Sequence, residues 1–93
     1  MWARVARFEG DPAELDGRVD RLRELIDSGT LPPELQDAKM LFLADRATGG
    51  VLSITLFESE EAMKTADAVM NSGAGHAGAR QSVDFYEVPL HSL

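Results

Sequence analysis

Two apolar runs in the middle of the chain, residues 38–46 and 51–57, form the strongest pattern in the sequence. Residues 40–44 are apolar throughout, and in 51–57 only Ser53 and Thr55 are polar, so neither of the two alternating faces is properly polar. The glycines at 49 and 50 suit a tight hairpin loop, which requires positive φ. The pattern predicts a β-hairpin that is too apolar for water to cover on either face.

Two helices are predicted from capping residues and apolar spacing. Asp11 can cap a helix that begins at Pro12, where the missing N–H costs nothing, and Glu14 then completes a capping box. Gly29 is a suitable stop for this helix, and Ser59 can cap a second one. The stripes expected to face a core are Leu15, Val19, Leu22, Leu25 and Ile26 in the first helix and Ala62, Met63, Ala66, Val69 and Met70 in the second. Arg18, Arg21, Arg23 and Glu24 are expected on the outer side of the first helix.

Strands are also expected over residues 2–9 and 82–90, with one helical turn at 33–36. The order βαββαβ predicts a single α+β domain over residues 1–93. It is of the ferredoxin-like type, with a four-stranded antiparallel sheet and both helices on one face. One chain then has helix enough to cover only one face, and the other would expose a large apolar patch. We expect a second copy to cover it, so that two sheets pair into a dimeric α/β barrel.

The charge balance disfavours some classes of partner. Sixteen Asp and Glu residues stand against 9 Lys and Arg, a net charge of −7, which argues against nucleic acid or an anionic membrane surface. The absence of cysteine excludes disulfides and thiolate chemistry. No apolar stretch approaches the ~20 residues of a membrane span, and we expect no secretory signal before Trp2. A soluble, cytoplasmic protein is therefore expected.

Motifs that carry chemistry are few. Residues 73–78 match G-x-G-x-x-G, but they follow a helix and precede a strand, whereas pyrophosphate binding needs the N-terminus of a helix that the motif opens. We interpret 73–80 as a small-residue loop, and whether it is a mobile flap is left open. His76 and His91 are the only histidines, and their spacing predicts no metal site.

Residues 52–63 (Leu-Ser-Ile-Thr-Leu-Phe-Glu-Ser-Glu-Glu-Ala-Met) resemble the antibiotic biosynthesis monooxygenase-like (ABM) members of the dimeric α/β barrel superfamily. In that family a strand ends in an aromatic-Glu-Ser-Glu-Glu/Asp motif that opens the second helix. Residues 5–12 and 85–88 also look like the family. The resemblance implies a homodimer through the sheets and a pocket between sheet and helices in each subunit. Activity does not follow, because relatives include cofactor-independent oxygenases of aromatic polyketides, haem-degrading enzymes and proteins without assigned chemistry.

The haem-degrading branch uses an Asn on the first strand, with a Trp and a ligand His on or after the second helix. Motif matching places Ala6, Ala66 and His76 at these positions, so only the His is kept and haem degradation is disfavoured.

If Ala6 faces the pocket, strand alternation puts Trp2, Arg4 and Phe8 on the same face. Arg4 would then be the only charge there and could hold an anionic or phenolate ligand. The alternative for Arg4 is an ion pair with an acidic residue on a neighbouring element.

The sequence thus predicts a homodimeric barrel protein that binds a small, largely apolar ligand without a cofactor or metal. One alternative is a cofactor-independent monooxygenase in which enclosure stabilises a substrate carbanion or phenolate. Another is a scaffold whose pocket is filled by its own side chains. The predicted ligand contacts are Arg4, His76, Trp2, Phe8, Phe57 and Met63.

Overall fold

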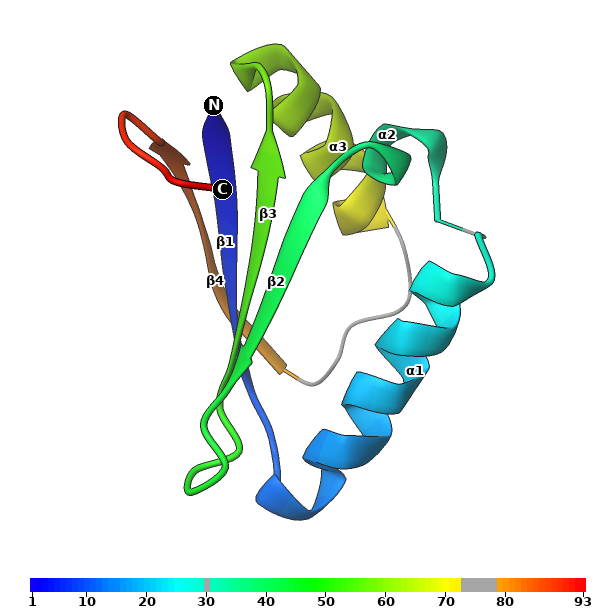
Figure 1. The fold of residues 1–93 in the computed structure, drawn as a ribbon. Coiled ribbons are helices and arrows are strands. Elements are labelled where there is room, and N and C mark those ends of the chain that lie inside the picture. Colours follow the sequence, from blue (N-terminus) through cyan, green and yellow to red (C-terminus); the bar gives the residue numbers. More distant parts are fainter. Residues whose placement is uncertain (30, 73–78) are drawn as a thin grey trace.

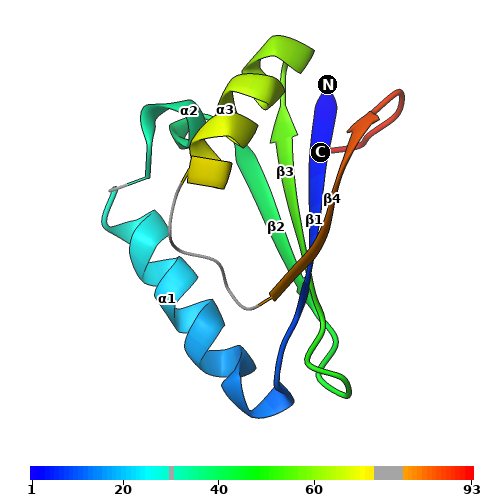
Figure 2. The same ribbon diagram turned by 180° about the vertical axis from the view of Figure 1, so that it is seen from behind.

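A computed structural model describes residues 1–29, 31–72 and 79–93. Its four strands form one antiparallel sheet in the order β2-β3-β1-β4, and the helices lie on a single face of it (Figures 1 and 2). This arrangement confirms the predicted ferredoxin-like α+β fold. The strands are β1 (Trp2–Glu9), β2 (Lys39–Ala44), β3 (Val51–Phe57) and β4 (Ala79–Glu87).

The helical elements are the 3-10 turn η1 (Pro12–Glu14), α1 (Leu15–Asp27), the single turn α2 (Pro33–Gln36) and α3 (Glu60–Ser72). None of the helices in the described part of the chain is long and apolar enough to cross a membrane.

The predicted helix caps are present, with one correction. Oγ of Ser59 accepts a hydrogen bond of 3.1 Å from the N–H of Ala62 and opens α3. Asp11 likewise caps η1, and its Oδ1 accepts a bond of 2.9 Å from the N–H of Ala13. The capping box predicted for Glu14 is wrong, because the first turn is 3-10 and Glu14 lies toward Arg18, 3.8 Å from its guanidinium.

The hairpin loop begins earlier than the sequence pattern predicts. β2 ends at Ala44, because the carboxylate of Asp45 accepts hydrogen bonds from the N–H groups of Ala47 and Thr48 and turns the chain there. Gly49 has φ +82°, as expected of a glycine in such a loop. It packs against the backbone of Gly10, so the loop is docked onto the connection that follows β1.

β4 also differs from the prediction for the last strand. It begins at Ala79 and ends at Glu87, whereas 82–90 was expected. It starts earlier because β1 continues to Glu9 and pairs with it through a register shift after Arg7. It ends before Pro89, which has no N–H to donate, while the N–H of Val88 still donates to the carbonyl of Met1.

The strand pairing separates the side chains of the sheet into two faces. The helix-covered face carries Arg4 opposite Thr55 and Ala6 opposite Ser53. The predicted grouping of Trp2, Arg4, Ala6 and Phe8 on one face is therefore consistent with the register. The other face, called the open face below, has no helix over it in either view (Figures 1 and 2).

The core lies where α2 and α3 meet the sheet. Leu35, Phe57, Met63 and Ala66 form its buried cluster, and Trp2 packs against it. Ala62 belongs to the predicted stripe of α3 but is exposed, because the helix turns it away from this cluster.

The predicted stripe of α1 is buried only at its N-terminal end. Leu15 is fully buried, whereas Leu25 and Ile26 are 47% and 53% exposed. The prediction for the C-terminal half of this stripe is therefore wrong for the single chain. Arg18, expected on the outer side, is buried instead.

Candidate functional site

Arg4, the one charge that the sequence places on the helix-covered side of β1, takes part in an ion pair. Its Nε lies 2.7 Å from Oδ1 of Asp67 on α3, and its side chain is only 6% exposed. Thr55, its partner on the neighbouring strand β3, is buried as well. The structure thus shows the ion pair that was one of the two alternatives, and a contact of Arg4 with a ligand stays a prediction.

The other predicted ligand contacts do not come together in one cavity. Trp2, Phe57 and Met63 pack within the core cluster, so their side chains fill space between sheet and helices. Phe8 lies at the far end of β1 and lines a hollow beside the hairpin loop. His76 lies outside the described residues.

A different hollow opens between the helices and the edge of the sheet. It is formed by α1, α2 and β2 and measures about 460 Å³. We call this one the helix-edge hollow. Its lining has no charged side chain: Ile26, Gly29, Leu31, Leu35, Gln36, Ala38 and Met40.

The helix-edge hollow is built by local features of the sequence. Gly29, with φ +69°, ends α1 and lets the chain turn toward α2. The side chain of Gln36 is held by a hydrogen bond of 3.1 Å from its Nε2 to the carbonyl of Leu31. Met40 reaches the hollow from the helix-covered face of β2, and Ile26 reaches it from the exposed end of α1. A concave, mostly apolar site with few polar groups is typical of small-ligand binding.

Another hollow, of about 560 Å³, has a different character. It lies at the end of the sheet where β3 leads into α3, and its lining includes four charged residues: Glu34, Asp37, Lys39 and Glu58. All four are exposed, so water covers this hollow readily. It is a poorer candidate for an apolar ligand than the helix-edge hollow.

The open face is a regular array of twelve side chains. Alternate residues of the four strands project from it, and the strand pairing sets them in three rows. In the order β2, β3, β1, β4 the rows are Lys39, Leu56, Ala3, Tyr86; then Leu41, Ile54, Val5, Asp84; then Leu43, Leu52, Arg7, Ser82. The exposed fractions of Leu41, Leu43 and Tyr86 are 46%, 47% and 55%, high values for large side chains.

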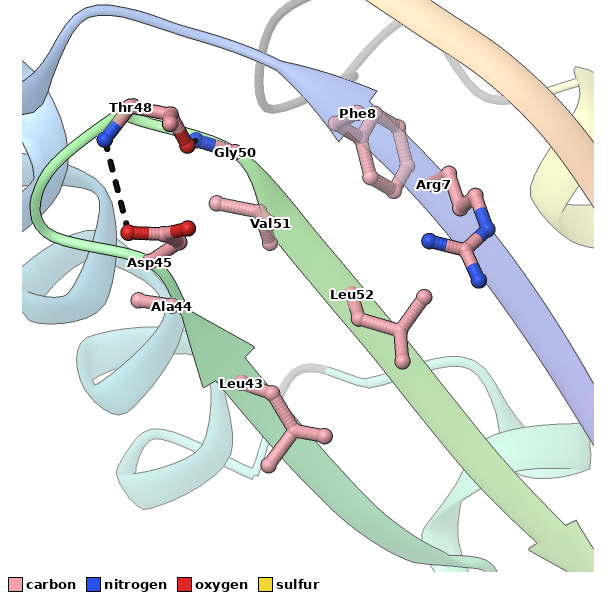
Figure 3. A pocket seen from close by; sticks show the side chains of 9 residues that line it. All are labelled: Arg7, Phe8, Leu43, Ala44, Asp45, Thr48, Gly50, Val51 and Leu52. Carbon is pink, nitrogen blue, oxygen red and sulfur yellow. Dashed lines mark hydrogen bonds between the residues drawn. The ribbon is translucent and has the colours of Figure 1, made fainter.

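The third row of the open face forms the floor of a hollow beside the hairpin loop (Figure 3). Arg7, Leu52 and Leu43 lie next to one another across β1, β3 and β2, with the helices behind the sheet. The hollow measures about 380 Å³, and the loop residues Asp45 and Thr48 close its far end. We call it the hairpin hollow.

Besides Lys39 at its corner, this largely apolar face carries two opposite charges, Arg7 and Asp84. Arg7 and Asp84 are diagonal neighbours on β1 and β4, because Arg7 pairs with Ser82 and Asp84 pairs with Val5. Both side chains are exposed, and within the described residues neither forms an ion pair or a side-chain hydrogen bond. The sequence pattern did not predict this pair, although the alternation of β1 that groups Arg4 with Ala6 also places Arg7 on the other face.

No metal centre is formed by the part of the chain that the structure describes, because no three His, Asp or Glu side chains converge there. No family model matches the chain, and no curated protein matches its sequence.

Proposed function

We propose that the protein is a homodimer, joined through the open faces of two sheets, that binds a small uncharged apolar ligand in the helix-edge hollow of each subunit. The observation that carries the ligand site is the lining of that hollow, in which five of the seven residues named above are apolar and none is charged. Its volume of about 460 Å³ lies within the usual range of ligand pockets. The resemblance of residues 52–63 to the ABM-like proteins supports the same assembly.

The chemistry of the ligand follows from the lining. A charged group would lose its hydration in this hollow without gaining an opposite charge, so the ligand is neutral. The amide of Gln36 offers the main side-chain hydrogen-bonding group, which suits an aromatic compound with one hydroxyl or carbonyl. This ligand differs from the anionic compound expected when Arg4 is taken as the contact, because Arg4 is neutralised by Asp67.

The dimer is supported by the composition of the open face. Burial of exposed leucine and tyrosine side chains is favourable by about 25 cal/mol per Å² of apolar surface. An antiparallel sheet that faces water normally alternates with polar residues, and this face does not.

The ligand site is tested with the neutral fluorescent probe N-phenyl-1-naphthylamine. Probe emission should rise on binding to the native protein, and Ile26→Glu should weaken binding roughly tenfold because it places a charge at the mouth of the helix-edge hollow. Leu25→Glu is the matched control, since Leu25 is similarly exposed on the same helix but does not line this hollow. Equal binding by the two variants would contradict the proposed site. Sedimentation velocity at micromolar concentration tests the dimer, and a single-chain species would contradict it.

A further inference from the structure

The charges on the open face select one orientation for the proposed dimer. A two-fold interface brings each residue of one copy onto a second residue of the other, and the reverse contact follows by symmetry. Two sheets pack either with their strands nearly aligned or with their strands nearly perpendicular. For the array of twelve side chains these two classes give four simple positions of the axis.

Both aligned arrangements place the charges badly. An axis along the strands brings β1 over β3 and β4 over β2, so Arg7 meets the partner's Leu52 and Asp84 meets the partner's Leu41. An axis across the strands brings Asp84 onto Asp84 of the partner subunit. The first arrangement buries unpaired charges and the second opposes two like charges, and both are unfavourable.

Of the two perpendicular arrangements, only one brings Arg7 to an opposite charge of the partner subunit. An axis on the diagonal from Leu43 to Tyr86 brings Arg7 over the partner's Leu41 and Asp84 over the partner's Leu56 and the partner's Ala3, so both charges are buried without an opposite charge. An axis on the other diagonal, from Lys39 to Ser82, brings Arg7 over the partner's Asp84. This axis also brings Leu43 over the partner's Tyr86. It sets the two Lys39 residues beside each other at the exposed corner of the face, where their long side chains can turn out to solvent.

We propose that the two copies cross at nearly a right angle about the Lys39–Ser82 diagonal. In this arrangement Arg7 of each copy pairs with the partner's Asp84, and the partner's Tyr86 ring lies in the hairpin hollow on Leu43 and Leu52. This inference rests on the proposed homodimer and adds its orientation. Strand β4 of one copy then lies along the third row of the other copy.

The dimensions of the two elements agree with this docking. Leu43 and Arg7 are two strand spacings apart, about 9.6 Å, and Tyr86 and Asp84 are two residues apart on one strand, about 6.6 Å. The mismatch of about 3 Å is well within the reach of an arginine side chain. The hairpin hollow has a volume of about 380 Å³ and is lined by Leu43, Leu52 and Arg7, so it has room for an aromatic ring.

A charge-reversal series tests the ion pair. Arg7→Asp and Asp84→Arg should each weaken the dimer at least tenfold in sedimentation equilibrium, because each opposes like charges across the interface. The double variant Arg7→Asp/Asp84→Arg should return to within about threefold of the native affinity, since it restores two opposite pairs. Arg21→Asp on α1 changes the net charge by the same amount away from the open face and should leave the affinity unchanged.

Disulfide trapping tests the orientation independently, and the native chain has no cysteine to interfere. Leu43→Cys/Tyr86→Cys should form a covalent dimer on mild oxidation. Within one chain these positions lie three strands apart, too far for a disulfide. Tyr86→Cys alone should stay monomeric on non-reducing gels, because the Tyr86 positions of the two copies meet only when the axis runs on the Leu43–Tyr86 diagonal.

The outcomes separate the two proposals. A native dimer that is unaffected by Arg7→Asp, that is not trapped by Leu43→Cys/Tyr86→Cys, or that is trapped by Tyr86→Cys alone, overturns the orientation while the homodimer stands. A native chain that sediments as a monomer overturns both.

Discussion

Nε of Arg4 lies 2.7 Å from Oδ1 of Asp67, so an ion pair joins β1 to α3 between the sheet and the helices. The two partners differ in exposure, with 6% of the Arg4 side chain and 21% of the Asp67 side chain accessible. Water can therefore hydrate Asp67 if its partner is removed, but it cannot reach Arg4 to the same extent.

Removal of the Asp67 charge should cost more stability than removal of the Arg4 charge. Asp67→Asn leaves a buried, unpaired guanidinium and should lower the free energy of unfolding by about 2 to 3 kcal/mol. Arg4→Met should lower it by only about 1 kcal/mol, because the carboxylate that remains is partly hydrated. Urea denaturation at one protein concentration measures both. Lys64→Ala, which breaks an exposed pair with Glu60 on α3, is the control and should cost less than about 1 kcal/mol. A larger loss in Arg4→Met than in Asp67→Asn would contradict this view of the pair.

Gly49 should be the least replaceable residue of the hairpin loop. Gly49→Ala requires a side chain at φ +82° and brings its Cβ against the carbonyl of Gly10, so we expect a loss of about 2 kcal/mol or more. Gly50→Ala meets only Oγ1 of Thr48, at 3.3 Å, and should cost well under half as much. Thermal unfolding of the two variants side by side measures the difference, and equal losses would show that the loop does not dock on Gly10.

Arg18 should be replaceable by an apolar residue with a gain in stability. Its side chain is 6% exposed, and its buried Nη1 has no hydrogen-bond partner among the described residues. A buried unsatisfied donor costs about 1 to 3 kcal/mol, so Arg18→Met, which keeps the length and removes the donors, should raise the free energy of unfolding by about 1 kcal/mol. Arg21→Met, at an exposed position on the same helix, should change it by less than about 0.5 kcal/mol. A loss of stability in Arg18→Met would show that the guanidinium has a favourable contact.

The cap of α3 should account for a measurable part of the stability. Ser59→Ala removes the oxygen that accepts from the N–H of Ala62 and should cost about 1 kcal/mol. Ser59→Asp supplies another acceptor and a charge suited to the N-terminus of the helix, and should be close to the native protein. Chemical denaturation distinguishes them, and an unchanged midpoint in Ser59→Ala would mean that the hydrogen bond is replaced by water.

The features that the sequence predicted correctly depend on neighbours close in the chain. Ser59 caps the helix three residues before Ala62, and Gly29 and Gly49 adopt positive φ because each ends or turns a local segment. The strand alternation correctly grouped Arg4 with Ala6, since successive residues of a strand always point to opposite faces.

Apart from the bounds of β2 and β4 and the capping box, the wrong predictions concern which surfaces are buried. The spacing of Leu15 to Ile26 predicted one continuous buried stripe, but spacing alone does not specify how far along α1 the neighbouring elements extend. Arg18 was expected to be exposed because of its charge. Its burial beside Gly10 depends on the path of the chain between β1 and α1, which no local pattern specifies.

The sequence by itself determined the order of the strands and helices, their caps and the division of each strand into two faces. These follow from interactions between residues a few positions apart, so the spacing of residue types along the sequence is enough to predict them. Only the tertiary structure decided that Arg4 meets an aspartate 63 residues away, that an uncharged hollow opens beside α2, and that Arg7 and Asp84 lie as unpaired neighbours on the open face. Such relationships depend on how the elements pack, and packing is set by the whole chain at once.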